Sequence, residues 1–67
     1  GAVFSFGASL KGEGLPAGSR VIVYTIDGQV TGSGIVSETG TVDIPLGGQT
    51  GVFIVKSSSK TFKFIKK

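Results

Sequence analysis

The sequence contains no cysteine, histidine, methionine or tryptophan, and only 16 % of its 67 residues are charged. Without cysteine no disulfide can form, and without cysteine or histidine a tetrahedral zinc site has no ligands of the usual kind. Acid–base catalysis and nucleophile triads rely most often on histidine. No apolar run approaches the roughly 20 residues of a membrane-spanning helix. We therefore expect no enzyme activity, no metal, no cofactor and no small-molecule substrate.

The polar residues that remain offer little chemistry. Three of the four acidic residues lie in predicted turns, and the fourth alternates with apolar neighbours and should face solvent; they are Glu13, Asp27, Glu38 and Asp43. The run Ser57–Ser59, followed by Lys60, formally allows a serine–lysine dyad. A hydrophilic hairpin loop explains the same run more simply.

What the sequence does contain is a series of short, β-branched or aromatic runs separated by glycine, proline and serine, without helical periodicity. The two strongest runs, 20–26 and 51–56, are apolar on both faces, which predicts central strands covered on both sides. Asp27–Gly28 between two such runs predicts a hairpin. The predicted strands are Val3–Leu10, Arg20–Ile26, Gln29–Thr31 with a continuation at Ile35–Val36, Thr41–Ile44, Gly51–Lys56 and Lys60–Lys66.

Six strand candidates in 67 residues indicate one all-β domain spanning residues 1–67. Short turns between strands leave an antiparallel sandwich or a small barrel as the architectures that fit. The segment 12–18, rich in glycine and containing Pro16, is predicted as a loop.

Positive charge is concentrated in the last predicted strand. The net charge is +3, and five of the seven basic residues lie between Lys56 and Lys67. Such lysines protect an exposed edge strand, or they meet an acidic partner. Phe62 and Phe64 interleave with lysines, as in some single-strand nucleic-acid binders. The two phenylalanines are more simply the core face of an amphipathic strand, which disfavours nucleic-acid binding.

Three segments together resemble a known family. Arg20–Val30, Gly51–Lys56 and Lys60–Lys66 are similar, in type and order, to the C-terminal sorting domains of type IX secretion cargo in Bacteroidetes. Tyr24 and Gly28, with Asp27 beside the glycine, match a Tyr-x-x-x-Gly motif. Gly51–Val55 matches a Gly-aromatic-hydrophobic segment in which Phe53 replaces the usual tyrosine.

The resemblance implies an immunoglobulin-like antiparallel β-sandwich of about six to seven strands. It implies that residues 1–67 are the C-terminal domain of a longer secreted protein, recognised by outer-membrane secretion machinery and carried through the periplasm to the cell surface or beyond. Recognition is expected at the last strand, through backbone pairing together with Lys63, Lys66 and Lys67. Gly28 and Gly51 are expected to be structural, and Tyr24 and Phe53 to lie in the core.

Two other functions remain open at this stage. The chain fits a structural or adhesive immunoglobulin-like module of the cell surface, and it fits, less well, a small basic nucleic-acid-binding barrel. An edge strand that pairs with secretion machinery could also pair with a second copy, which predicts a weak homodimer.

Overall fold

The computed structural model describes residues 1–67 and contains seven β-strands. The strands are β1 (Val3–Phe6), β2 (Ser9–Glu13), β3 (Arg20–Thr25), β4 (Val30–Ile35), β5 (Val42–Pro45), β6 (Gly51–Lys56) and β7 (Thr61–Lys66). No helix in the structure is long and apolar enough to span a membrane.

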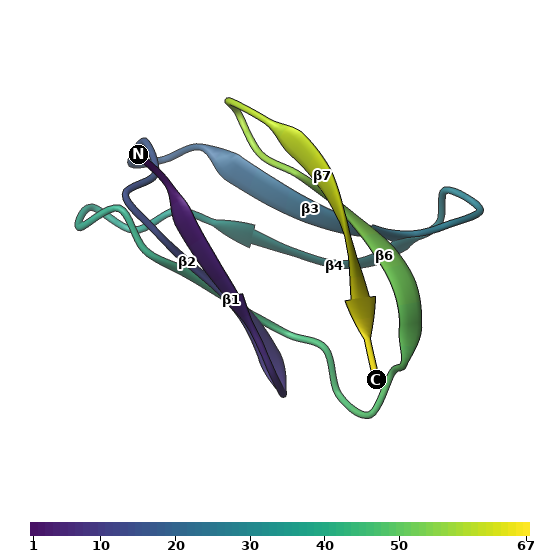
Figure 1. Cartoon of the computed structure of the whole chain (residues 1–67). Helices are drawn as coiled ribbons and strands as arrows, with labels where there is room; N and C mark the ends of the chain where they lie inside the picture. The colour runs from purple at the N-terminus through teal and green to yellow at the C-terminus, as the bar shows by residue number, and fades with distance from the viewer.

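The strands form two antiparallel sheets that stack face to face (Figure 1). One sheet has the order β1-β2-β5 and the other has the order β4-β3-β6-β7. The chain crosses between the sheets after β2, β4 and β5, as in immunoglobulin-like sandwiches. The prediction of an all-β sandwich is confirmed. The barrel alternative is wrong, because the sheets do not join into a closed cylinder.

The core fills the space between the sheets. Alternate residues of each strand point inward because successive side chains of a strand lie on opposite faces. Burying these apolar side chains is the main favourable term in folding. The buried hydrophobic residues are Leu10, Leu15, Val21, Val23, Val36, Val42, Ile44, Leu46, Phe53, Val55 and Phe64.

The segment predicted as one strand, Val3–Leu10, is a hairpin of two strands, so that prediction is wrong. Phe6 lies opposite Leu10, and the chain reverses at Gly7 and Ala8. Three residues separate Phe6 from Leu10 in the sequence, so even-numbered residues face the core on both β1 and β2. The period of two therefore continues through the turn and conceals it. β2 also extends to Glu13, into the predicted loop 12–18, because Gly12 and Glu13 pair with Phe4 and Val3 of β1.

The predicted break at Gly32 and Gly34 is also wrong, since β4 includes both glycines; its pairing with β3 shifts register at Thr31, before them. Both glycines face the other sheet where β4 approaches β5. A β-carbon at Gly32 would lie 2.8 Å from Cγ2 of Ile44, and one at Gly34 would lie 2.9 Å from Cγ2 of Val42. These glycines permit a close approach of two backbones, which is one of the uses of glycine in a strand.

The two doubly apolar strands, β3 and β6, are central in the four-stranded sheet, as predicted. They are not covered on both sides, so that part of the prediction is wrong. A two-layer sandwich buries only one face of each sheet. On the outer face Ile22, Tyr24, Val52 and Ile54 remain half-buried, while Ile65 of β7 is 67 % exposed.

Candidate functional site

The open flank is the space between β1 and β7, the edge strands of the two sheets on one side of the sandwich (Figure 1). Neither strand has a partner on this side, so each presents a row of backbone N–H and C=O groups outside its sheet. The two strands run in the same direction, because Phe4 contacts Phe62 and Phe6 contacts Phe64.

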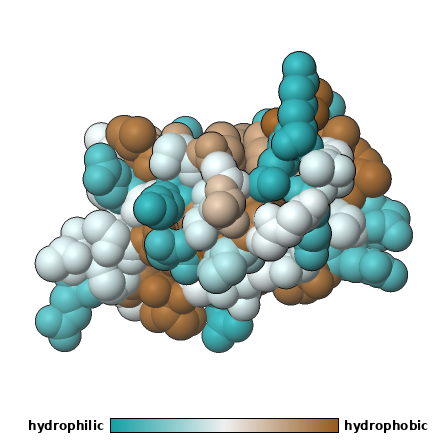
Figure 2. Space-filling model, turned by 90° about the horizontal axis from the view of Figure 1, so that it is seen from below, coloured by the Kyte–Doolittle hydropathy of each residue, from teal (hydrophilic) through white to brown (hydrophobic).

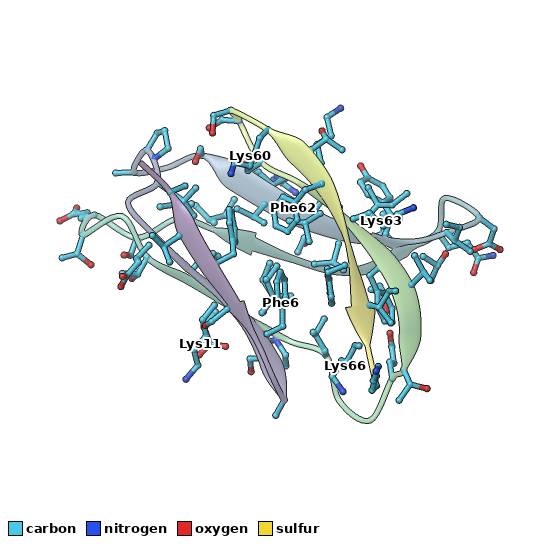
Figure 3. The ribbon with its side chains drawn as sticks, in the orientation of Figure 1. Phe6, Lys11, Lys60, Phe62, Lys63 and Lys66 are labelled. Carbon is cyan, nitrogen blue, oxygen red and sulfur yellow. The ribbon has the colours of Figure 1, made fainter.

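Phenylalanine side chains from both strands fill the interior of the open flank. The ring centroids of Phe4 and Phe62 are 4.9 Å apart, and those of Phe6 and Phe64 are 4.1 Å apart in a stacked arrangement. Phe64 continues the series to Phe53, at 5.4 Å. Figure 3 shows Phe6 and Phe62 pointing into the space between the two strands. Phe6 stays 43 % exposed, so the aromatic cluster reaches the surface there.

The three lysines predicted to mediate recognition do not form one group. Lys63 lies on the outer face of the four-stranded sheet, opposite Ile54, and points away from the open flank (Figure 3). Lys66 shares the inward face with Phe62 and Phe64 and is half-buried at the end of β7. Lys67 follows it and is exposed. The predicted set is therefore divided between an outer-face lysine and a terminal pair.

The terminal pair borders a small hollow at one end of the open flank. The hollow has a volume of about 250 Å³ and is lined by Phe6, Gly7, Ile65, Lys66 and Lys67. A neighbouring hollow of about 270 Å³ adjoins the β1–β2 turn and includes Lys11. No acidic side chain lines either hollow. This end of the open flank therefore combines an exposed aromatic ring with the positive charge of Lys66 and Lys67.

Lysine also marks the other end of β7. The Lys60 ammonium lies 5.9 Å from the centroid of the Phe62 ring, within range of a cation–π contact. β1 and β7 contain no acidic residue. Positive charge therefore accompanies the exposed backbone of β7 along its whole length.

The serine–lysine dyad considered from the sequence is not formed. Ser57 Oγ donates a hydrogen bond to the Lys60 carbonyl at 3.1 Å and accepts one from the Lys60 backbone N–H at 3.3 Å. The Ser57 hydroxyl is thus used to close the β6–β7 turn through the backbone of Lys60. The hairpin-loop interpretation of Ser57–Ser59 is the one that the contacts support.

The matched motif residues Tyr24, Asp27 and Gly28 lie at the β3–β4 hairpin, away from the open flank. The hairpin predicted from Asp27–Gly28 is confirmed by the antiparallel pairing of β3 and β4. The Asp27 carboxylate accepts a hydrogen bond from the Thr25 hydroxyl. Tyr24 is half-buried on the outer face of its sheet, so its prediction as a core residue is wrong.

Gly28 has a backbone φ of 90°, in the region that favours glycine. We expect Gly28→Ala to lower the free energy of unfolding by about 1–2 kcal/mol, the cost of a left-handed backbone for an L-residue. Gly48→Ala is the matched control, because Gly48 has no positive φ and a β-carbon there would touch nothing. Urea denaturation of both variants measures the difference, and equal midpoints would contradict the assignment.

Gly51 and Phe53 lie on β6, next to the candidate site. Gly51 begins the strand with a φ of 123° and lies opposite Lys66. Phe53 is 3 % exposed, so its prediction as a core residue is confirmed. Through Phe53 and Phe64 the aromatic series of the open flank is anchored in the core.

The largest surface hollow, about 430 Å³, lies over β2, β4 and β5 on the opposite side of the molecule. Its charged residues, Lys11, Glu13 and Asp43, are all exposed. No three acidic, histidine or cysteine side chains lie close enough together to hold a metal ion. On the face shown in Figure 2, hydrophobic side chains occur as separate patches among hydrophilic and weakly polar residues.

Sequence reasoning missed β1 as part of the site. The sequence places Phe4 and Phe6 in the predicted strand Val3–Leu10, and the chain has a second Phe-x-Phe pair at Phe62 and Phe64. Two such pairs, one near each end of the chain, are the signal that could have indicated a contact between the first and last strands.

Comparison of the chain with protein-family models, curated proteins and solved structures found no match.

Proposed function

We propose that this domain is a secretion sorting signal, recognised by a protein of the outer-membrane export machinery, which directs an attached cargo to the cell surface. The observation that carries the proposal is that β7 is an edge strand with one unpaired side. An exposed edge is a template on which another chain can add a strand.

The resemblance to type IX sorting domains supports the proposal in three further places. The family's sandwich has the same class of architecture as this chain. The Tyr-x-x-x-Gly motif ends in a glycine that needs positive φ, at the β3–β4 hairpin. The lysine-rich last segment is β7, whose Lys63 side chain is exposed and accessible to a receptor.

The lysines of β7 have two effects on what can pair with this edge strand. Charged side chains, lysine above all, prevent unspecific pairing at an exposed edge. The same charges favour a receptor with a complementary acidic surface, since electrostatic complementarity selects partners and speeds their encounter. A sorting signal needs both properties, because it must remain soluble before it meets its receptor.

Export of a reporter tests the proposal. Residues 1–67 are fused to the C-terminus of a periplasm-directed fluorescent protein in a Bacteroidetes host, and surface and periplasmic fluorescence are compared. We expect a surface signal that disappears in a host lacking the translocon. In the variant with Lys63, Lys66 and Lys67 all replaced by glutamate, we expect the signal to remain in the periplasm.

Lys56→Glu is the matched control, because Lys56 is an exposed lysine on the central strand β6 and not on the edge. This variant should be exported like the unmodified domain. Periplasmic retention of the unmodified fusion would overturn the sorting function and favour a structural or adhesive module.

A further inference from the structure

We propose that the open flank binds an extended segment of a protein partner in which aliphatic and acidic side chains alternate, as an added strand antiparallel to β7. The proposal rests on the proposed function for the identity of the partner, which would be a receptor of the export machinery. The chemistry of the segment follows from the side chains of β7, on both of its faces, and from Phe6 of β1.

The backbone of β7 supplies the first part of the argument. β7 is paired to β6 over its full length and has no strand on its other side. With six residues it is longer than β1, which has four, so it can hold more of an added strand. Antiparallel pairs are slightly more stable per residue than parallel ones.

The side chains of β7 determine the alternation. On its inner face, Phe62 and Phe64 would flank the inward residues of an added strand, which should therefore be aliphatic. On its outer face, Lys63 lies between Thr61 and Ile65, so the outward residue of an added strand beside Lys63 should be acidic. At the ends of β7, Lys60 and the inward-facing Lys66, with Lys67 beside it, favour negative charge at the two ends of the added strand.

Phe6 supplies the contact that distinguishes the open flank from an ordinary edge. Its ring is stacked on Phe64 and yet 43 % exposed. An aliphatic side chain entering beside β7 would cover this exposed part of the ring. A partly exposed aromatic side chain that borders surface hollows is a typical anchor for a bound segment.

Two other occupants fit the open flank less well. A second copy adding its own β7 would bring lysines against lysines, and like charges across paired strands are destabilising. A nucleic-acid strand needs exposed aromatic faces for base stacking. Here only Phe6 is substantially exposed, while Phe64 is buried and Phe4 and Phe62 are partly buried.

The test is a titration of ¹⁵N-labelled protein with a short synthetic peptide in which valine and glutamate alternate. We expect backbone amide shifts in β7 and β1, and new contacts between amide protons of β7 and the peptide. A peptide with lysine in place of glutamate should bind at least about tenfold more weakly. A peptide of the same composition, with its valines and glutamates in separate blocks, should also lose binding.

Two variants locate the binding on the protein. Phe6→Ala should weaken the glutamate peptide about tenfold, because truncating a central aromatic anchor costs more than losing a rim contact. Val3→Ala is its matched control, as Val3 lies on the same strand, 60 % exposed, with its side chain on the other face. Replacing both Lys63 and Lys66 with glutamate should reverse the preference toward the lysine peptide.

Several results would overturn the inference. They are amide shifts confined to β4 and β5, equal binding of the two charged peptides, an unaffected Phe6→Ala variant, or tighter binding of a single-stranded oligonucleotide. Absence of any shift would overturn it as well. Export of the reporter without peptide binding would refute this inference and leave the sorting function, while peptide binding without export would do the reverse.

Discussion

Leu10→Ala is expected to leave most of the protein unfolded in buffer at room temperature. Leu10 is completely buried on β2, the central strand of its sheet, opposite Phe6 on one side and Ile44 on the other. Removing a completely buried leucine side chain costs about 3–5 kcal/mol, from lost transfer energy and from the cavity that remains. A core of this size rarely supplies more than about 3–5 kcal/mol in total, and this chain has no disulfide to add to it.

Circular dichroism and one-dimensional proton NMR measure this result directly. The variant should lose the dispersed methyl and amide signals of a folded sheet, and urea should produce no cooperative transition. Val30→Ala is the matched control, because Val30 is 61 % exposed and its truncation leaves no cavity. A Leu10→Ala variant with an unchanged urea midpoint would show that β2 does not contribute to the core as described.

Gly34→Val is expected to lower the free energy of unfolding by up to about 3 kcal/mol, the upper range for overpacking a core. Gly34 faces β5, and a β-carbon there would lie 2.9 Å from Cγ2 of Val42 and 3.2 Å from Cγ1 of Ile44. The valine methyl groups extend further than the β-carbon and would force β4 away from β5. The sandwich is held together on that side by this close approach.

A second substitution makes this prediction specific to the contact. Val42→Ala in the Gly34→Val background should recover part of the lost stability, since residues in contact couple by about 0.5–3 kcal/mol in double-mutant cycles. Ser33→Val, on the same strand but facing solvent, should be neutral or slightly stabilising because valine favours strands. Additive losses in the double variant would contradict the proposed contact between the sheets.

Stability measurements of this kind are also needed to interpret the functional experiments, because an unfolded variant would lose function for that reason alone. Loss of export or of peptide binding has meaning only if the variant remains folded. Lys63 and Lys67 are exposed, and substitutions at such positions usually change stability little. Urea midpoints for the Lys63 and Lys67 substitutions should therefore stay close to that of the unmodified protein. Phe6→Ala loses ring contacts with Phe62 and Phe64 and should lower the midpoint, so its peptide titration is carried out at a temperature at which urea denaturation shows it folded.

The two sides of the sandwich differ in how closely the edge strands of the two sheets approach each other. Between β4 and β5 the sheets approach closely through Gly32 and Gly34. Between β1 and β7 they are separated by phenylalanine rings, one of which reaches the surface. We infer from this difference that a further strand adds at the open flank and not at the β4–β5 side.

Much of the architecture follows from the sequence by itself. The all-β class, the absence of helices, the Asp27–Gly28 hairpin and the full extent of β6 were predictable because turn chemistry and the two-residue period are local properties. The burial of Phe53 and the exposure of Asp43 follow from the same alternation. The lysine-rich last strand was also evident, as composition alone identifies it.

Only the tertiary structure decided the rest. The turn at Gly7 is hidden because the alternation of Phe4, Phe6 and Leu10 continues through it. Gly34 acts as a contact and not a break because β5 lies against it. Tyr24 lies on an uncovered face because the domain has only two layers. Likewise the open flank exists because strands from the two ends of the chain meet there, and no local pattern encodes a contact between residues so far apart in sequence.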